Sequence, residues 1–461
     1  MLLQNNKYMD LIYSTSLVIC LLSSAIFFIL MFYASLIFWS EKENNAALKS
    51  IAIAVILPLP YLFSWIYNWE ILALILSLDL LLTTILFFLP FPTSKNITED
   101  FPNHQIDERN TMFSRNELEP GSDRYKDYYK QYPEKKILDD AFRKEAGLTS
   151  KRSIFYNTLA FAAANASFYT ISQLGNAVED TVHPEKQDIS SKYMATFLQE
   201  WGKKLGAMEI GFTKLSDYHY YSHKGRGETY GKEITNHHKY AIAFTVEMTR
   251  EMVTAAPQAS IVMESGQQYL EAGRIAVQIA QFLRNLGYPA RAHIDGNYQV
   301  VCPLVARDAG LGEIGRMGLL MTPRKGPRVR LGVITTDFEF PVHKWNKNHS
   351  LLDFCNRCKK CADVCPSKSI SWNPPKEING VKRWQINSES CFTYWCKAGT
   401  DCGRCMATCP YSHPDNLLHN SIRWGIKHSP LFRRIAVPLD DFFYGRKPKS
   451  AKMPKWILDK K

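Results

Sequence analysis

Three apolar runs dominate the first 92 residues, and few polar positions separate them. Residues 12–39 contain no charged side chain, and a helix rising about 1.5 Å per residue over this length crosses a hydrocarbon core of roughly 30 Å. Two further apolar runs, at residues 51–67 and 71–92, are split by the polar break 68–70. The pattern predicts a membrane anchor of three transmembrane helices over residues 1–92. The alternative is a cleaved signal peptide before a buried hairpin, but the first run is too long for a signal core.

Beyond the anchor, the hydrophobic pattern changes to that of a globular protein. Residues 93–150 are polar but contain several tyrosines, which favours a wrapping segment with short helices. The following pattern predicts helices at 152–176, 191–204 and 269–286, the last one ended by Gly287, and strands at 240–246, 290–294 and 328–335. Alternation of strands and helices predicts an α/β domain spanning residues 151–345, within a chain of mixed α+β and α/β class.

Charge is distributed unevenly along the chain. The first 92 residues hold three lysines against five acidic residues, whereas the remainder has 53 Lys and Arg against 39 Asp and Glu. Such a basic remainder suits an anionic membrane surface, an acidic redox partner or an anionic substrate. A nucleic-acid partner is not expected, because no basic stripe interleaved with aromatic residues occurs before the C-terminus. The basic end of the chain, Arg423 to Lys461, is expected near anionic membrane lipid, with a solvated tail as the alternative. Within it, residues 426–461 are predicted to form a C-terminal tail.

Nine of the eleven cysteines lie between Cys355 and Cys409, and their spacing is typical of two [4Fe–4S] clusters. The first motif has the C-x2-C-x2-C-x3-C-P form found in bacterial two-cluster ferredoxins, and a second, partial copy follows. Three thiolates of one loop hold three corners of a cubane, and the fourth cysteine reaches the other cluster. The expected ligands are Cys355, Cys358, Cys361 and Cys409 for one cluster, and Cys365, Cys402, Cys405 and one more for the other.

The eighth ligand is either Cys391 or Cys396, and we favour Cys391. Zinc is the alternative metal, but zinc sites pair two C-x2-C knuckles and have no use for a repeated Cys-Pro. The sequence therefore predicts a bacterial-ferredoxin-like double-cluster domain over residues 346–425. Two adjacent clusters conduct electrons, so the preceding domain is expected to hold a redox centre.

The side of the membrane follows from cofactor assembly. Iron–sulfur proteins are normally assembled in the cytoplasm, and a folded one is exported with a twin-arginine signal. No arginine precedes Arg109. We therefore expect a multi-pass protein of the inner membrane with its catalytic part in the cytoplasm.

Several short motifs together carry a resemblance to a known family. In this order ahead of the cysteines, the chain has DER at 107–109 with MFSR at 112–115, LGYPA at 286–290, AGLGEIGR at 309–316, GPRVRL at 326–331 and TTD at 335–337. From residue 107 to the C-terminus, the chain resembles the cobalamin-dependent reductive dehalogenases and, more distantly, the epoxyqueuosine reductases.

This resemblance implies a cobalamin, bound base-off in a corrinoid-binding domain of nitroreductase-like fold at 151–345, that removes halide from an organohalide. Tyr269 matches the family's proton donor, and Arg328 matches an arginine near that tyrosine. The third polar pocket residue is Asp295 or Asn297, and we name Asn297 as the catalytic candidate. Taken alone, Tyr269 is more often a core aromatic and Arg328 a solvated charge.

A glycine-rich motif and a histidine-containing segment help to predict how the cofactor is bound. Gly310, Gly312, Gly315 and Arg316 are expected to bind the corrinoid, because closely approaching backbone suits a flat macrocycle. As a dinucleotide fingerprint the same glycines lack the acidic residue that should follow. The segment from Asp217 through His219 lacks the final glycine of a D-x-H-x-x-G cobalt-binding motif, which argues against a histidine ligand to cobalt.

Two other functions compete with reductive dehalogenation. An epoxyqueuosine-type reductase would act on tRNA, for which a membrane anchor has no use. A membrane electron-transfer protein without its own substrate would hold two clusters and no corrinoid. In the favoured interpretation, the electron donor is a quinol or a ferredoxin-like protein.

Overall fold

Two compact units make up the chain. The computed structural model describes residues 2–89, 101–235, 237–343 and 347–458. One unit comprises Met1–Ser94 with Asn416–Pro448, and the other comprises Lys95–Asp415 with Lys449–Lys461. The expected tail at 426–461 is thus divided, because most of it groups with the N-terminal helices.

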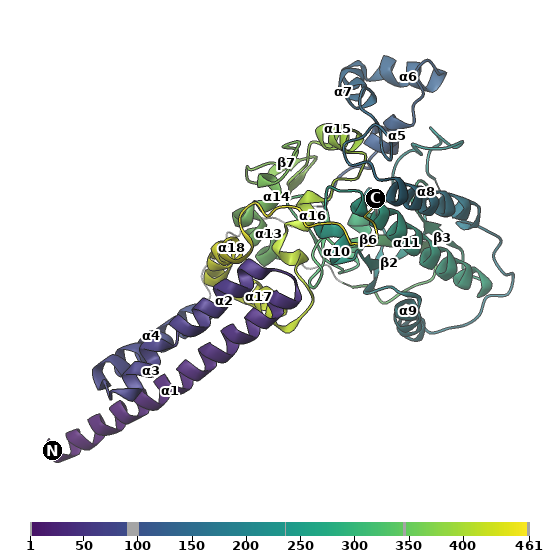
Figure 1. Ribbon diagram of the computed structural model, residues 1–461. Coiled ribbons are helices and arrows are strands. Elements are labelled where there is room, and N and C mark those ends of the chain that lie inside the picture. The colour runs from purple at the N-terminus through teal and green to yellow at the C-terminus, as the bar shows by residue number, and fades with distance from the viewer. Residues whose placement is uncertain (1, 90–100, 236, 344–346, 459–461) are drawn as a thin grey trace. The chain divides into compact units, whose positions relative to one another are not determined.

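The first unit is entirely helical in its described residues. Its helices are α1 (Leu2–Ser40), α2 (Asn44–Ile56), α3 (Leu59–Ile66), α4 (Glu70–Phe88), α17 (Leu417–His428) and α18 (Pro430–Tyr444) (Figure 1). Three stretches are long and apolar enough to cross a membrane: Lys7–Ser40, Asn44–Ile66 and Glu70–Phe88. The three predicted apolar helices are confirmed, although residues 90–92 of the last one lie outside the described residues. Pro58, which cannot donate a backbone hydrogen bond, separates α2 from α3.

The second unit is built around a four-stranded sheet. Its strands are β1 (Ile210–Lys214), β2 (Tyr240–Glu247), β6 (Val329–Thr336) and β3 (Ala290–His293), in this spatial order. All three strand pairs are antiparallel, with Tyr240 opposite Thr336 and Ala290 opposite the same threonine. The expectation of an α/β domain is therefore corrected to α+β. Alternating strands and helices give a parallel sheet only when each helix brings the chain back to the end of the sheet where the previous strand began. The connections between the paired strands here do not do so.

Both faces of the sheet are covered, which explains the almost continuous apolar sequence of β2. Ile242, Phe244 and Val246 face a core shared with α9 (Ser191–Leu205) and α11 (Ser260–Asn285). The alternate residues Ala241 and Ala243 face α12 (Cys302–Asp308) on the other side. Because side chains alternate along a strand, the large residues fill the wider layer and the alanines admit the closer helix.

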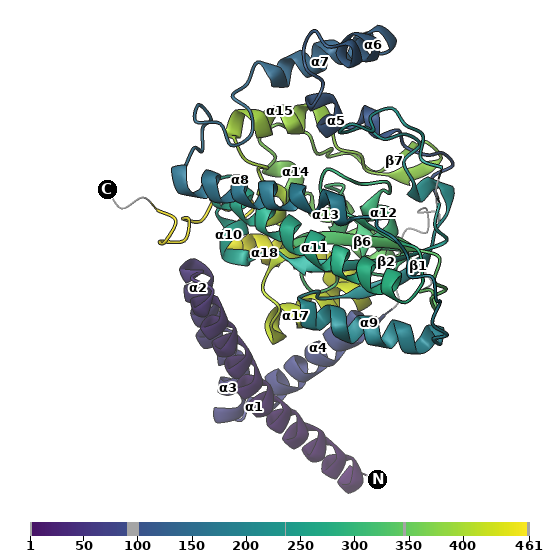
Figure 2. The same cartoon turned by 90° about the vertical axis from the view of Figure 1, so that its right-hand side faces the viewer.

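Helix α11 carries the candidate catalytic tyrosine and lies across the sheet beside α8 (Thr158–Gln173) (Figure 2). A Cβ on Gly273 would lie 2.9 Å from Cδ1 of Ile171, and one on Gly266 would lie 3.1 Å from the carbonyl oxygen of Ala164. The two glycines are seven residues apart and therefore share one helix face. They allow α8 to pack closely on α11 and fix its rotation.

The remaining elements of the second unit surround this core. They are η1 (Glu108–Asn110), α5 (Met112–Asn116), α6 (Asp123–Gln131), α7 (Pro133–Arg143), η2 (Leu174–Ala177), η3 (Asp217–His219), α10 (Arg250–Thr254), β4 (Glu313–Ile314), β5 (Leu320–Met321), α13 (His349–Cys358), α14 (Lys360–Asp363), β7 (Lys376–Ile378), β8 (Val381–Arg383), α15 (Ser388–Ala398), α16 (Arg404–Ala407) and η4 (Pro410–Ser412). The predicted helices and strands of residues 151–345 are all present, and β1 was not predicted. Short helices α5 to α7 occupy the predicted wrapping segment.

Candidate functional site

The first cysteine group forms where α13 and α14 meet the chain before η4. Its members Cys355, Cys358, Cys361 and Cys409 are each less than a tenth exposed and line one small cavity. Burial and the neighbouring thiolates of Cys355, Cys358 and Cys361 raise the pKa of Cys409 well above its usual value. Among the described residues, no three or more His, Cys, Asp or Glu side chains converge on a single-ion position. Four thiols around a cavity are the arrangement that a multi-iron cluster requires.

The second group brings together Cys365, Cys391, Cys402 and Cys405. Burial, followed by the charges of Cys402, Cys391, Cys361 and Cys365, raises the pKa of Cys405 well above its usual value. Cys402 has a positive φ of 59° and Gly403 one of 65°, so the loop turns sharply before α16. This turn directs two thiols of one loop to the same side.

Cys396 lies on a different face of α15 from Cys391. The two residues are five positions apart, which rotates their side chains by about 140° at 3.6 residues per turn. Cys396 is buried in an apolar cluster with Met112, Phe142 and Phe392. The structure therefore brings Cys391, and not Cys396, to the second group.

Gly315 and Arg316 lie beside the first cysteine group. A Cβ on Gly315 would lie 3.6 Å from Sγ of Cys355. The buried Arg316 donates from Nε to the carbonyl oxygen of Cys355 at 3.0 Å, and from Nη1 to that of Asn373 at 2.9 Å.

The cavity that Tyr269 lines in the second unit, which we call the main cavity, has a volume of about 480 Å³. Elements from far apart in the chain line it: Glu108, Thr111, Phe113, Leu148, Thr149, Asn165, Phe168, Tyr221, Arg226, Val262, Ser265, Tyr269, Asp295, Tyr298, Val300, Cys302, Pro303, Leu319, Leu320, Pro327, Val329, Arg330, Leu331, Trp395 and Asp401. Gly310, Gly312, Gly315 and Arg316 do not line it. Gly312 instead approaches the backbone of Met321, and Gly310 approaches His343. Their binding to a corrinoid stays a prediction.

Tyr269 and Arg330 form the polar centre of this cavity. The Cζ atom of Arg330 lies 4.7 Å from the centroid of the Tyr269 ring. Nη2 of Arg330 donates to Oδ2 of Asp401 at 2.8 Å and to Oγ of Ser265 at 2.6 Å. Ser265 stands four residues before Tyr269 on α11, so both point from one helix face into the cavity.

The electrostatic surroundings keep this pair in its ordinary protonation states. Burial raises the pKa of Tyr269, and the positive charge of Arg330 opposes that rise. Burial disfavours the Arg330 guanidinium, yet the charges of Tyr269, Asp401, Tyr298 and Asp295 raise its pKa overall. At neutral pH the site therefore presents a protonated phenol next to a guanidinium.

Arg328 does not take the expected place near Tyr269. Its side chain is 1% exposed, and it donates from Nε to the carbonyl oxygen of Ser412 at 2.9 Å and from Nη1 to Oε1 of Glu247 at 3.1 Å. It precedes the first residue of β6, and the chain turn ending there directs it away from the cavity. Arg330, two residues later, occupies the position expected for Arg328.

Between the two candidates for the third pocket residue, only Asp295 lines the cavity. Asp295 and Asn297 lie in the tight turn closed by the hydrogen bond from the Asn297 N–H to the carbonyl oxygen of Ile294, at 3.0 Å. The Asn297 side chain instead accepts from Nη2 of Arg291 at 2.7 Å. Burial raises the pKa of Asp295, and the charges of Arg226 and Arg330 oppose that rise.

Asp401 is a site residue that the sequence analysis missed. Its carboxylate binds both Arg330 and Ser265, and it immediately precedes Cys402. It therefore connects the loop of the second cysteine group to the guanidinium over Tyr269. Its position directly before a predicted cluster cysteine is the sequence feature that could have identified it.

A second cavity, of about 610 Å³, adjoins the first. The two share Thr111, Phe113, Tyr221 and Trp395, and the second also reaches Cys391. On the walls of the main cavity, the buried atoms Nε of Arg330, Nε of Arg226 and Oδ1 of Asp401 have no hydrogen-bond partner among the described residues. Buried polar atoms rarely lack a hydrogen-bond partner, and a polar ligand in the cavity would provide one.

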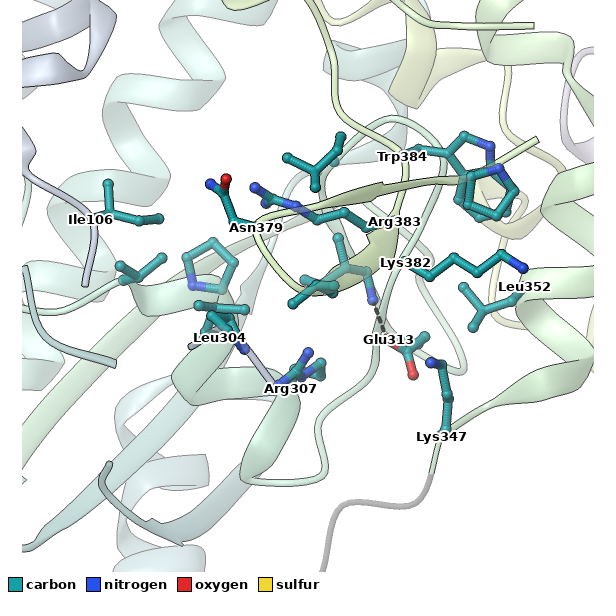
Figure 3. A pocket seen from close by; sticks show the side chains of 18 of the residues that line it. Ile106, Leu304, Arg307, Glu313, Lys347, Leu352, Asn379, Lys382, Arg383 and Trp384 are labelled. Carbon is teal, nitrogen blue, oxygen red and sulfur yellow. Dashed lines mark hydrogen bonds between the residues drawn. The ribbon is translucent and has the colours of Figure 1, made fainter. Parts of the chain in front are cut away.

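A third cavity, of about 210 Å³, shares Pro303 with the first and is strongly basic (Figure 3). Four basic residues and the buried Glu313 line it. The basic residues are Arg307 from α12, Lys347, and Lys382 and Arg383 from β8. Nε of Arg383 is buried with no hydrogen-bond partner in the part of the chain that the structure describes. The β7–β8 hairpin turns at Asn379 and Gly380, both with positive φ. This dipeptide is a strong hairpin signal that the sequence analysis did not use.

The His219 side chain makes a structural contact with Asp308. Its Nε2 lies 2.9 Å from Oδ2 of Asp308, which also accepts from the Tyr218 hydroxyl at 2.6 Å. His219 is 1% exposed and does not line the main cavity. Cys302 is buried and contributes to the wall of the main cavity, and burial raises its pKa to about 12.

Comparison with known proteins identifies the cysteine region. Residues 354–413 match the model of the 4Fe-4S dicluster domain, so the expectation of a double iron–sulfur domain is confirmed. A tetrachloroethene reductive dehalogenase of Desulfitobacterium hafniense is 33% identical over 216 residues, covering 44% of this chain and 38% of that protein. Epoxyqueuosine reductases are also similar over shorter stretches. The chain spans about two fifths of the length of the first of these relatives.

Solved structures share the fold. The catabolic reductive dehalogenase NpRdhA superposes with a TM-score of 0.62 at 22% identity, over 77% of this chain and 49% of that one. A reductive dehalogenase structure described for B12-dependent dehalogenation gives a TM-score of 0.58 at 26% identity, over 67% of this chain and 46% of that one. The resemblance inferred from the sequence motifs is confirmed: the chain is similar to the reductive dehalogenases in sequence, in fold and in its double iron–sulfur domain.

Proposed function

We propose that the protein is a membrane-anchored reductive dehalogenase that uses a corrinoid and two [4Fe–4S] clusters. An organohalide, two electrons and one proton would give the hydrogen-substituted product and a halide ion. One observation carries this proposal. A cavity with a phenol and a guanidinium on its wall adjoins a second cavity that reaches the second cysteine group.

The cysteines would hold the clusters in two sets of four. Cys355, Cys358, Cys361 and Cys409 would hold the first cluster, and Cys365, Cys391, Cys402 and Cys405 would hold the second. Cys391 is assigned because Cys396 is buried among apolar side chains.

The first two cavities would hold the corrinoid. Their volumes, about 480 and 610 Å³, and their four shared residues suit a ligand much larger than an organohalide. Nε of Arg330 and Oδ1 of Asp401, which have no hydrogen-bond partner among the described residues, fit the amide groups on the rim of such a macrocycle. The third cavity would take the nucleotide arm, with Arg307, Lys382 and Arg383 towards its phosphate. When bound, the corrinoid supplies a reducible cobalt centre that can break a carbon–halogen bond.

The chain's own residues would manage the proton and the charge. Tyr269 would donate its phenolic proton to the carbon that loses the halide. Arg330, 4.7 Å from the ring centroid, would stabilise the phenolate that remains. Asp295, rather than Asn297, would be the third polar group facing the substrate, and Asp401 with Ser265 would hold Arg330 in place.

The cellular arrangement is also part of this proposal. The three apolar helices would span the inner membrane, and the second unit would face the cytoplasm. Residues 151–345 would form a nitroreductase-like corrinoid-binding domain, flanked by the segment 93–150 and the cluster domain 346–425. Either a quinol or a ferredoxin-like protein would supply the electrons.

Metal analysis combined with a halide assay tests the proposal. The full chain, purified without oxygen and reconstituted with cobalamin, should contain one cobalt and about eight iron atoms per chain. It should release halide from an organohalide when an artificial one-electron donor is supplied. Apoprotein carried through the same steps without cobalamin is the control and should release none.

Two results would favour other functions. Full iron content without cobalt uptake would favour a membrane electron-transfer protein. Cobalt uptake with reduction of an epoxyqueuosine-containing tRNA stem loop, and no halide release, would favour an epoxyqueuosine-type reductase. The basic third cavity, which fits a phosphate-bearing arm, favours corrinoid binding over the first of these.

A further inference from the structure

Helix α18 of the first unit exposes an apolar stripe. Ile435, Leu439 and Phe442 are 44%, 42% and 47% exposed. They are spaced by four and three residues, so they share one face of the helix. On the opposite side, Ala436 and Val437 are buried. The helix is therefore apolar on its exposed side as well as on its buried side. Exposing such a stripe to water is unfavourable.

This helix and α17 are attached to the ends of the apolar helices. Nε2 of His419 in α17 lies 2.9 Å from Oε1 of Glu41, which directly follows α1. The exposed fractions of these two side chains are only 3% and 6%. This buried contact fixes α17 to the end of α1, because separating the two side chains would break a buried polar contact.

Contacts with α4 and α2 place both C-terminal helices at the same end of the bundle. The ring of Phe87, near the end of α4, lies 5.6 Å from that of Phe432 and 6.2 Å from that of Trp424. Near the start of α2, Lys49 donates to the carbonyl oxygen of Phe442 at 2.5 Å. The helices α1 and α4 end here and α2 begins here. For helices that cross a bilayer, this level is the headgroup region, where tryptophan prefers to lie.

The charge of the segment complements an anionic surface. Residues 416–448 contain six Lys and Arg against two Asp. Lys427 in α17 and Arg434 in α18 are exposed, and Arg434 borders the apolar stripe. The apolar stripe and Arg434 belong to α18, and Trp424 and Lys427 belong to α17. Together the two helices have the apolar face, basic residues and tryptophan of a segment that lies in the plane of a membrane interface.

We propose that α17 and α18 form an interfacial hairpin that lies in the headgroup layer of an anionic leaflet. The stripe of Ile435, Leu439 and Phe442 contacts the acyl boundary, while Lys427 and Arg434 contact anionic headgroups. This inference rests on the membrane anchoring in the proposed function and does not depend on the chemistry of the second unit. It also assigns a side: the end of the bundle that carries the hairpin faces the more anionic, cytoplasmic leaflet.

Photocrosslinking of the full chain in vesicles tests the lipid contact. p-Benzoylphenylalanine is placed at Leu439, and in a matched protein at Trp372, which is 49% exposed in the second unit. We expect lipid adducts from position 439 and none from position 372. Adducts of position 439 to a second copy or to another protein, without lipid, would overturn the inference.

The headgroup preference is tested in the same assay. Vesicles of phosphatidylcholine alone are compared with vesicles that also contain phosphatidylglycerol. We expect a several-fold higher adduct yield with the anionic lipid, and the double variant K427E/R434E should lose that gain. The control K192E/K204E, which changes two exposed lysines of α9, should retain it. Equal yields in both vesicles would contradict the anionic specificity.

Separate readouts distinguish failure of this inference from failure of the proposed function. Iron content and halide release, measured on the same preparations, report on the second unit only. Halide release with no lipid adduct would leave the dehalogenase intact and remove the hairpin inference. Lipid adducts without halide release would do the reverse.

Discussion

The two cysteine groups have similar spacing in sequence but different surroundings. The first group is closed off by Arg316, which binds the backbone around Cys355, and all four of its thiols are buried. In the second group Cys391 lines a large cavity, and Cys402 is joined through the preceding Asp401 to Arg330. If the proposed function holds, the second group would deliver electrons to the cavity and the first would receive them from outside.

The different surroundings follow from what packs on each loop. A buried arginine bonded to several carbonyl oxygens holds the first loop rigid. The second loop instead carries Asp401, whose Oδ2 accepts from Arg330 while its Oδ1 has no hydrogen-bond partner among the described residues. One group is therefore embedded in the protein and the other borders a binding site.

The largest effect is expected from breaking the second group. Cys391→Ser should remove about half of the iron, because one of two four-iron clusters loses a ligand, and should abolish halide release. Iron and acid-labile sulfide analysis after anaerobic purification measures the first effect. Cys396→Ser is the matched control on the same helix and should keep the full iron content. If the control lost iron and Cys391→Ser did not, the two assignments would have to be exchanged.

Removing the proton donor should have the next largest effect and leave both cluster groups intact. Tyr269→Phe should lower kcat by about 10²–10⁴-fold, the usual contribution of a positioned general acid, without changing iron or cobalt content. Because burial raises the pKa of Tyr269, the donor form is fully present below pH 10 and is lost only as pH rises through the raised value. Wild-type kcat should thus fall on this account only above pH 10. A variant with full turnover would exclude Tyr269 as donor.

The two arginines near β6 should separate catalysis from stability. Arg330→Gln should lower kcat by about 10²-fold, because it removes a preorganised charge beside the phenol. Arg328→Gln should instead reduce the free energy of unfolding by about 2 kcal/mol, since it breaks buried hydrogen bonds to a charged group. Halide release per folded molecule should be unchanged in Arg328→Gln. Steady-state kinetics and thermal unfolding distinguish the two, and the reverse pattern would restore Arg328 as the catalytic residue.

The cluster ligands could be predicted from the sequence because their geometry is local. Cys355, Cys358, Cys361 and Cys365 lie in one short stretch from the end of α13 to just after α14, so their spacing alone specifies the pattern. The choice between Cys391 and Cys396 was open, because it depends on which face of α15 packs on Met112 and Phe142. The apolar helices and the main strands were also predictable, since hydrophobic periodicity reflects their burial.

The cavity could be predicted only in part because it is assembled from distant segments. Tyr269 was identified through the family resemblance, yet Arg330 and Arg328 both fit the sequence signal and only tertiary packing separates them. A tight turn likewise decides between Asp295 and Asn297. The antiparallel sheet was missed because strand direction depends on the paths of the connections. The contact of Gly315 with the first cysteine group could not be predicted, since Cys355 lies forty positions later in the chain.

The smallest expected effect concerns the packing around the first group. Gly315→Ala adds a Cβ 2.8 Å from Cγ of Met321 and 3.6 Å from Sγ of Cys355. Overpacking costs about 1–3 kcal/mol, and the flexible methionine should hold the loss near the lower value. The paramagnetic resonance signal of the reduced first cluster should shift, while the second signal, identified by its loss in Cys391→Ser, stays unchanged. Gly175→Ala, where no atom lies within 4 Å of the new Cβ, should alter neither signal. A change confined to the second signal would contradict the placement of Gly315 beside the first cysteine group.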